Sequence, residues 1–189
     1  MMMLPSGRLL LALLLLGFLA AAGQASQGGP RIASSDIRFA ENAAHVSVRM
    51  DLDLNQSLVD ALDGGMLVFF THELEIVEPR LWGWGERELY RFLAQASVRR
   101  SDYGPGFEYR GFRSNLWRRA ETLDEALAAM AVHELVLDDP LVLGTLRRLD
   151  AFVQNRIEVD LDKLPNPIKI ELMTSADWLF SSPWTRLPN

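Results

Sequence analysis

Apolar and polar residues alternate along several stretches of the chain, which is the pattern of β-strands with one buried and one exposed face. The clearest stretch is residues 44–54, where Val46, Val48 and Met50 fall on one side and Arg49 falls on the other. Because successive side chains of a strand point to opposite faces, this stretch predicts a strand with one face in water. The same reasoning predicts further strands over residues 35–40, 66–77, 88–100, 107–113, 151–161 and 168–172.

Two short helices interrupt this series of strands. Asn55 can cap a helix over residues 56–62, and Thr122 followed by Glu125 has the spacing of a capping box. Residues 141–149 fit a strand or a helix. Consecutive strands with short connections favour antiparallel pairing. The predicted fold is therefore mainly β (α+β by count), an antiparallel curled sheet or β-sandwich with two short helices.

The inward-facing residues of these strands are expected to form one core. Its expected members are Val46, Val48, Met50, Phe70, Leu74, Phe92, Val159 and Ile170. The prolines of Pro165-Asn166-Pro167 restrict the backbone, so we expect a rigid turn that leads into the last strand. Trp178 should then lock the C-terminal end under the sheet, with Asp177 or Ser181 satisfying nearby backbone donors.

The N-terminal residues have the layout of a secretory signal. Arg8 precedes an apolar run over residues 9–19, and small residues then offer cleavage sites after Ala22 or Ala25. Counted from Leu9 to Ala22, the apolar stretch is roughly 14 residues long, which is shorter than the ~20 that span a bilayer. We therefore expect a signal peptide over residues 1–25, a flexible leader over 26–34 and a single β-rich domain over 35–189. The expected location is periplasmic or exported, and the alternative is an inner-membrane anchor formed by an uncleaved N-terminal segment.

Composition narrows the possible functions. The chain has no cysteine, which excludes disulfides, thiol catalysis, cysteine-ligated metals and a lipoprotein anchor. Charge is divided into blocks: residues 26–79 carry 3 arginines and 9 acidic residues, residues 80–119 carry 9 arginines and 4 acidic residues, and the remainder is acidic again. This net negative balance argues against nucleic acid as the partner. No second apolar stretch is long enough to cross a membrane.

Candidate catalytic groups are few. Alternation places His72 on an apolar face of its strand, while Glu73 and Glu75 point to the opposite face. His72 could serve there as a metal ligand, as a general base or as a hydrogen-bonded core residue. His133 is expected as a cation at the end of the second helix, beside Glu134. No metal-binding, nucleophile or phosphate-loop motif occurs, so no cofactor is expected. An enzyme acting on envelope polymers through unidentified acidic or histidine residues is the alternative to a non-catalytic function.

The basic middle of the chain is the candidate binding surface. Arginines of two neighbouring strands and their connections, together with two tryptophans around Gly83, make up this surface: Arg91, Arg99, Arg110, Arg113, Arg118, Arg119, Trp82 and Trp84. Guanidinium groups suit phosphate and carboxylate partners, including anionic lipid head groups, and exposed tryptophans suit a lipid interface. The alternative is that the arginines pair with acidic residues of the same chain and that the tryptophans close the end of a sandwich.

Several short motifs resemble one protein family. They are Leu161 to Pro167 (LDKLPNP), Asp177 to Trp184 (DWLFSSPW), Asp60 to Gly65 (DALDGG), Arg80 with the Trp82/Trp84 turn, and Leu123 to Leu127. The chain resembles the proteobacterial domain-of-unknown-function family 4390. The resemblance implies a bacterial envelope protein without assigned catalytic residues, encoded beside a membrane sensor kinase. We therefore expect a binding, accessory or regulatory domain whose partner is another envelope protein, such as that kinase, or an anionic lipid.

Overall fold

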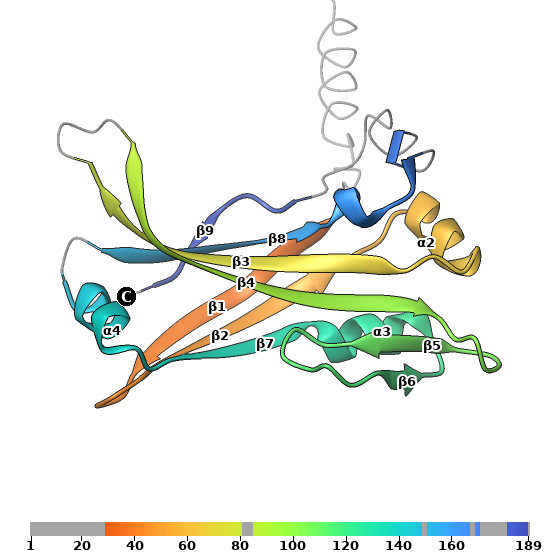
Figure 1. Ribbon diagram of the computed structural model, residues 1–189, viewed down its shortest axis with the longest axis horizontal. Helices are drawn as coiled ribbons and strands as arrows, with labels where there is room; N and C mark the ends of the chain where they lie inside the picture. The colour runs from red at the N-terminus through yellow and green to blue at the C-terminus, as the bar shows by residue number, and fades with distance from the viewer. Residues whose placement is uncertain (1–28, 81–84, 149–150, 167–168, 171–180, 189) are drawn as a thin grey trace, which may run out of the picture.

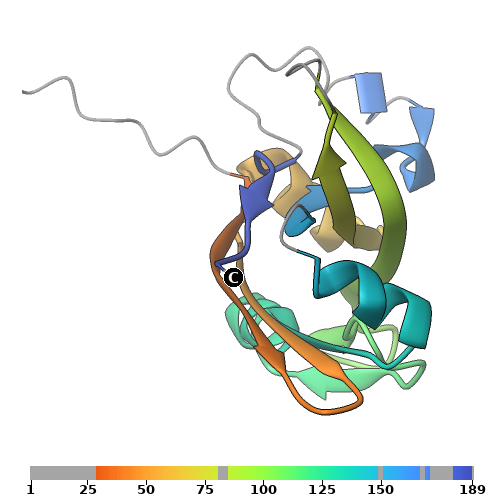
Figure 2. The same cartoon turned by 90° about the vertical axis from the view of Figure 1, so that its left-hand side faces the viewer.

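The computed structural model describes residues 29–80, 85–148, 151–166, 169–170 and 181–188 of the chain (Figure 1). The strands in these residues form two sheets, and every pairing between them is antiparallel. The end-on view in Figure 2 shows the two sheets as separate layers. The prediction of a mainly β, antiparallel fold is confirmed.

The smaller sheet has three strands in the order β1-β2-β7. They are β1 (Pro30–Phe39), β2 (Ala44–Leu52) and β7 (Val132–Leu137). The alternation read from the sequence for β2 is confirmed, because its even-numbered residues are buried and its odd-numbered residues, apart from the half-buried Asp51, are exposed. The expected flexible leader over residues 26–34 is wrong from Pro30 onward, because this segment pairs with the end of β2. As an edge strand, β1 carries small polar residues that are exposed or half-buried, Ser34, Ser35 and Asp36, so its composition resembles that of a loop.

The larger sheet has six strands in the order β6-β5-β4-β3-β8-β9. The two central strands are the longest, and the edges are short. In chain order the strands are β3 (Val68–Pro79), β4 (Glu86–Arg100), β5 (Phe107–Arg110), β6 (Arg118–Ala120), β8 (Phe152–Val159) and β9 (Thr185–Arg186). The C-terminal segment thus returns to pair with β8 as an edge strand.

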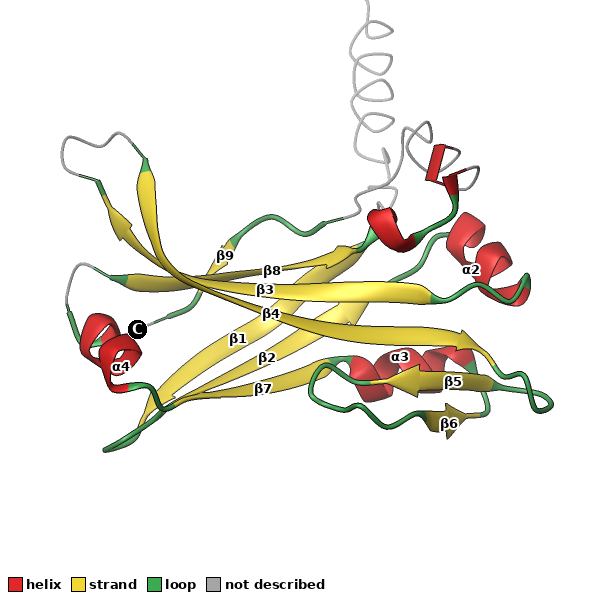
Figure 3. Ribbon diagram, viewed as in Figure 1, coloured by secondary structure: helices red, strands yellow, loops and turns green. Residues whose placement is uncertain are grey.

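Helices lie at the ends of the two layers (Figure 3). They are α2 (Gln56–Asp63), α3 (Leu123–Met130) and α4 (Pro140–Leu146). Asn55 caps α2, and Thr122 with Glu125 forms the predicted capping box of α3. Residues 140–146 are a helix because Asp139 accepts two backbone N–H bonds ahead of a proline in the first turn. The described residues therefore hold three α-helices of seven or eight residues where we expected two, as well as a short 3-10 helix, Leu161–Lys163, and helical residues at 166 and 169–170.

The core lies between the two sheets. Of its expected members, Val46, Val48, Met50, Phe70, Leu74 and Val159 are buried, and Phe92 packs against them half-buried. Ile170 is 63% exposed and helical, so the strand expected over residues 168–172 is wrong where the structure describes it. Lys169 N–H donates to the carbonyl of Pro165 at 3.0 Å, which is a helical bond that begins at the proline.

Candidate functional site

A cavity of about 470 Å³ opens where the β5–β6 hairpin meets β7 and the end of α3. These elements lie side by side at one end of the molecule (Figure 1). The volume falls within the range of small-ligand sites, about 300–1,000 Å³. Its walls carry polar groups from three elements and their connections: Tyr109, Arg113, Ser114, Arg118, His133 and Glu134.

Two of the predicted binding arginines, Arg113 and Arg118, line this cavity. Arg118 stands opposite Tyr109 in the hairpin register, so both side chains lie on the same face of the hairpin. Arg113 donates to the backbone carbonyl of Glu134 at 2.8 Å. The carboxylate of Glu134 points to the other face of β7, because its neighbour His133 is buried and Glu134 itself is exposed. Within the described part of the chain, neither arginine pairs with a carboxylate.

One residue that lines the cavity, His133, belongs to a pair of buried histidines, one from each sheet. His72 Nδ1 lies 2.9 Å from His133 Nδ1, and His72 Nε2 lies 3.3 Å from Asn155 Oδ1. The amide of Asn155 donates to the carbonyl of Thr185 at 3.0 Å, which fixes its oxygen toward His72. His72 must then donate from Nε2 and accept at Nδ1, so the proton shared by the two rings belongs to His133 Nδ1.

This proton arrangement leaves His133 Nε2 as a bare acceptor. That atom is buried and has no hydrogen-bond partner among the described residues. Burial is the main reason that the pKa of His133 falls to about 3, with smaller contributions from its electrostatic interactions with His72 and Arg113. Burial likewise lowers the pKa of His72 to about 4, against the opposing effects of Asn155 and Glu73. Both rings are therefore neutral at neutral pH, and His133 Nε2 keeps its lone pair.

The structure corrects the expectation for His133 and supports that for His72. We expected His133 to be a cation at the end of a helix, but α3 ends at Met130 and β7 begins at Val132. The alternation of His133, Leu135 and Leu137 is the sequence signal that would have identified an inward-facing residue. His72 does point into the core, and Phe112 packs against both histidine rings.

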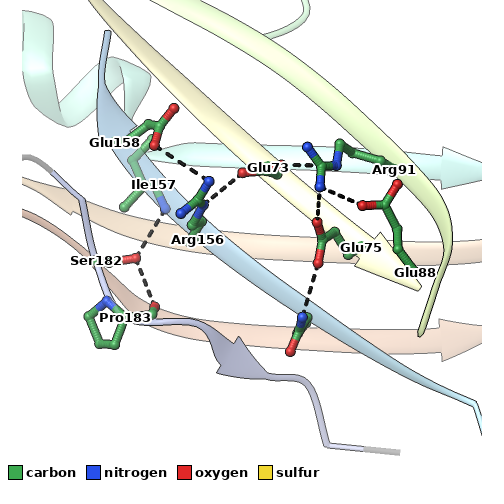
Figure 4. A network of polar contacts seen from close by, with 10 residues as sticks. Glu73, Glu75, Glu88, Arg91, Arg156, Ile157, Glu158, Ser182 and Pro183 are labelled. Carbon is green, nitrogen blue, oxygen red and sulfur yellow. Dashed lines mark hydrogen bonds and ion pairs between the residues drawn. The ribbon is translucent and has the colours of Figure 1, made fainter. Parts of the chain in front are cut away.

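The predicted surface arginine Arg91 lies elsewhere, in a network of charges on the outer face of the larger sheet (Figure 4). Its guanidinium contacts Glu73 at 3.1 Å and Glu75 at 2.8 Å, and it also pairs with Glu88. Arg156 donates to Glu73 at 2.7 Å from the neighbouring strand. Glu73 and Glu75 are buried, so Arg91 neutralises carboxylates of its own chain there.

The remaining predicted arginines surround the β5–β6 hairpin. Arg99 pairs with Glu108 at 2.7 Å, and its guanidinium lies 4.8 Å from the ring centre of Trp117. Arg110 lies over the same ring at 5.5 Å. Arg119 donates to two backbone carbonyls of the β4–β5 turn, those of Tyr103 and Pro105. Trp82 and Trp84 lie outside the described residues.

The structure thus divides the predicted arginines into two groups. Arg91 and Arg99 are held by carboxylates. For the other four, no carboxylate partner is found in the part of the chain that the structure describes: Arg110, Arg113, Arg118 and Arg119. We call these four residues the hairpin arginines.

Comparison with known proteins identifies the family. The family described as domain of unknown function (DUF4390) matches residues 28–188. The chain belongs to this family. Searches among curated proteins and among solved structures found no match. The DUF4390 match covers both sheets, the cavity and the hairpin arginines, so the site lies within the family domain.

Two further findings describe what this DUF4390 domain contains. Over the described ranges, no group of three or more His, Cys, Asp or Glu side chains is arranged to hold a metal ion. No helix in those same ranges has the length and apolar character needed to cross a membrane.

Proposed function

We propose that this DUF4390 chain is an exported, non-catalytic binding domain of the bacterial cell envelope whose β5–β6 hairpin binds anionic lipid head groups. The observation that carries the proposal is the group of hairpin arginines, which have no carboxylate partner among the described residues. An arginine without an internal anion keeps its charge and its remaining donors for an external phosphate.

Exposed apolar residues next to these arginines favour a lipid surface over an acidic protein segment. Leu116 is 73% exposed, and Trp117 is 39% exposed beneath Arg99 and Arg110. Both residues directly precede Arg118 in the loop that leads into β6. Tryptophan and leucine beside arginine suit the boundary between head groups and acyl chains, where one side is apolar and the other is charged.

The N-terminal segment supports the proposed location. Residues 1–25 have a basic start, an apolar run and small residues, and they precede both β1 and the matched family domain. Export through such a segment would bring the hairpin to the periplasmic side of a membrane, and an uncleaved segment would hold it there. A regulatory function through a membrane sensor kinase would use the same location.

Vesicle sedimentation tests the proposal. The full chain is expressed, purified and mixed with vesicles that contain phosphatidylglycerol, or with vesicles of phosphatidylcholine alone. We expect binding to the anionic vesicles only, and we expect added salt to weaken it because screening reduces the attraction between arginine and phosphate. Each arginine near an anionic surface contributes about 1 kcal/mol, so the double variant Arg110→Gln/Arg118→Gln should bind roughly 10- to 30-fold more weakly.

A matched variant separates the hairpin from total charge. Arg38→Gln/Arg49→Gln also removes two positive charges, and both residues are exposed on the smaller sheet. This control should bind like the unmodified chain. If both double variants lost vesicle binding to the same extent, the hairpin would be refuted as the contact surface. If the chain captured an acidic segment of an envelope protein but bound no vesicles, the result would refute lipid as the partner and favour a protein partner.

A further inference from the structure

The longest strand of the larger sheet is paired along only part of one edge. β4 has 15 residues, and β5 pairs with the last four of them, residues 97–100. On that side, residues 86–96 have no strand beside them in the part of the chain that the structure describes. β7, an edge strand of the smaller sheet, does not pair with β4. The larger sheet is therefore open along most of this edge.

The backbone of this edge has unpaired hydrogen-bonding groups. Ser101 N–H donates to the carbonyl of Gly106 at 3.0 Å, toward the side on which β5 lies. Backbone groups of a strand alternate in direction, and β4 has no register shift over residues 90–100, so its odd-numbered residues there direct theirs to the same side. Beyond the end of β5, Leu93 and Gln95 have no backbone partner on this side among the described residues. An edge of this kind accepts the backbone of an added strand.

Only one half of the open edge is protected against such pairing. Natural sheets protect exposed edges with charges, bulges or prolines. Residues 86–91 contain four charged residues and a shift in register, whereas residues 92–96 (FLAQA) contain no charge, no proline and no shift. The outer face of this second half includes Leu93, which is 65% exposed. Residues 92–96 are therefore suited to pairing with another strand.

A cavity of about 290 Å³ lies beside this segment, between β4 and β7. Inward-facing side chains of three strands line it, and they are apolar apart from the uncharged histidine pair: His72, Leu74, Phe92, Ala94, His133 and Leu135. Side chains on one face of a strand added to β4 would enter this space. The cavity therefore requires apolar side chains on that face.

The opposite edge, that of β7, is already occupied in part by Arg113. Met50 N–H donates to the carbonyl of Ala131, so alternation directs the backbone groups of Glu134 away from β2 and toward the open side. The guanidinium of Arg113 donates to the carbonyl of Glu134 there, at 2.8 Å. An added strand therefore pairs with β4. The exposed carboxylate of Glu134 forms no ion pair within the described residues, so it suits a basic side chain of that strand.

We infer that residues 92–96 of β4 bind an extended segment of another protein, which adds a strand to the larger sheet. The backbone of this segment pairs with that of Leu93 and Gln95. Apolar side chains on one face of the segment enter the cavity, and a basic side chain on the other face lies near Glu134. This function goes beyond the proposed lipid contact and uses a different surface.

Peptide selection tests the inference. A phage-displayed library of random peptides of about ten residues, the upper length of ordinary strands, is selected on the purified full chain. We expect enrichment of Val, Ile, Tyr and Phe without proline, as in segments that pair as strands. Leu93→Lys places a charge on the edge, so the selected peptides should bind it about 10-fold more weakly. The control Leu141→Lys changes an equally exposed leucine on α4 and should leave peptide binding unchanged.

Hydrogen exchange shows whether the peptide pairs as a strand. In the free chain, the amides of Leu93 and Gln95 should exchange at least about 10-fold faster than those of Phe92 and Ala94, which face β3. The bound peptide should slow both to the rate of their neighbours. Slow exchange at Leu93 and Gln95 in the free chain would show that the edge is already occupied, and it would overturn the inference. Peptide binding that leaves both amides fast would overturn it as well.

The added strand and the lipid contact can fail separately. Leu93 lies outside the β5–β6 hairpin, so Leu93→Lys should retain binding to phosphatidylglycerol vesicles. Vesicle binding without enrichment of any peptide would overturn the added strand and leave the lipid-binding hairpin standing. Peptide binding that depends on Leu93, in a chain that binds no vesicles, would refute only the lipid contact.

Discussion

At the scale of residues, the most informative feature is the uncharged histidine pair between the sheets. Alternation along β3 predicted that His72 faces inward, and this is confirmed. Its partner His133 was assigned to a helix end because the capping box predicts where α3 begins but contains no signal for where it ends. The pairing joins residues 61 positions apart, so only the packing of the two sheets brings them together.

The histidine pair predicts a specific dependence of stability on pH. The folded-state pKa values, about 4 for His72 and about 3 for His133, lie below the usual value of 6.5, so the unfolded chain binds more protons below pH 6.5. Stability is therefore complete above that pH and falls as the pH decreases toward the folded-state values. At pH 5 each of the two histidines should lower the unfolding free energy by about 2 kcal/mol relative to its value above pH 6.5.

Urea denaturation between pH 5 and pH 8 measures this effect. His133→Asn should reduce the difference in unfolding free energy between the two pH values. The third histidine of the chain provides the control, because His45 is exposed on β2 and His45→Gln should retain the full difference. A pH dependence that is identical in all three proteins would show that carboxylates, and not these histidines, determine acid stability.

At the scale of elements, the long strands were predictable and the last segment of the chain was not. The alternation in β2, β3, β4 and β8 identified each strand and its inner face, because a half-buried strand imposes a period of two on the sequence. Residues 181–188 have no such pattern. They bind β8 mainly through the backbone, with Ser182 N–H donating to the carbonyl of Ile157 at 2.7 Å and Leu187 N–H donating to that of Val153 at 2.8 Å.

This C-terminal segment should stabilise the fold even though β9 itself is only two residues long. Leu187 is buried in the core at 1% exposure, and the hydroxyl of Ser182 accepts a hydrogen bond from Ile157 N–H. Leu187→Ala should lower the unfolding free energy by about 2–4 kcal/mol, because it removes buried methyl groups and leaves a cavity. The measurement is urea denaturation at neutral pH.

The control for this substitution is a leucine with opposite burial. Leu141 lies at the start of α4 and is 73% exposed, so Leu141→Ala should change stability by less than about 0.5 kcal/mol. The expected lock by Trp178 stays a prediction, because Trp178 and Asp177 lie outside the described residues. Equal effects of the two leucine substitutions would show that the C-terminal segment does not stabilise the sheet.

At the scale of the whole molecule, folding neutralises part of the charge blocks of the sequence. The basic block 80–119 pairs with the acidic block before it: Arg91 with Glu73 and Glu75, and Arg100 with Asp63. Composition identified the blocks, but it could not show which arginines would find partners, since that depends on strand register. Within the basic block, the described residues provide no carboxylate for the hairpin arginines or for Arg80.

This division predicts that stability and binding depend on different arginines. Arg156 donates to Glu73, whose side chain is only 4% exposed, so Arg156→Gln takes one of two cations from a buried carboxylate. Unfolding free energy should fall by about 1–3 kcal/mol, less than for a buried charge left with no partner, because Arg91 remains. Arg118→Gln should change the unfolding free energy by less than about 0.5 kcal/mol, since Arg118 is exposed and has no carboxylate to leave behind.

Vesicle binding at equal folded concentration should show the reverse order, with a large loss for Arg118→Gln and little for Arg156→Gln. If the same substitution reduced both properties most, the hairpin arginines would be structural residues, and the anion-binding proposal would fail with them.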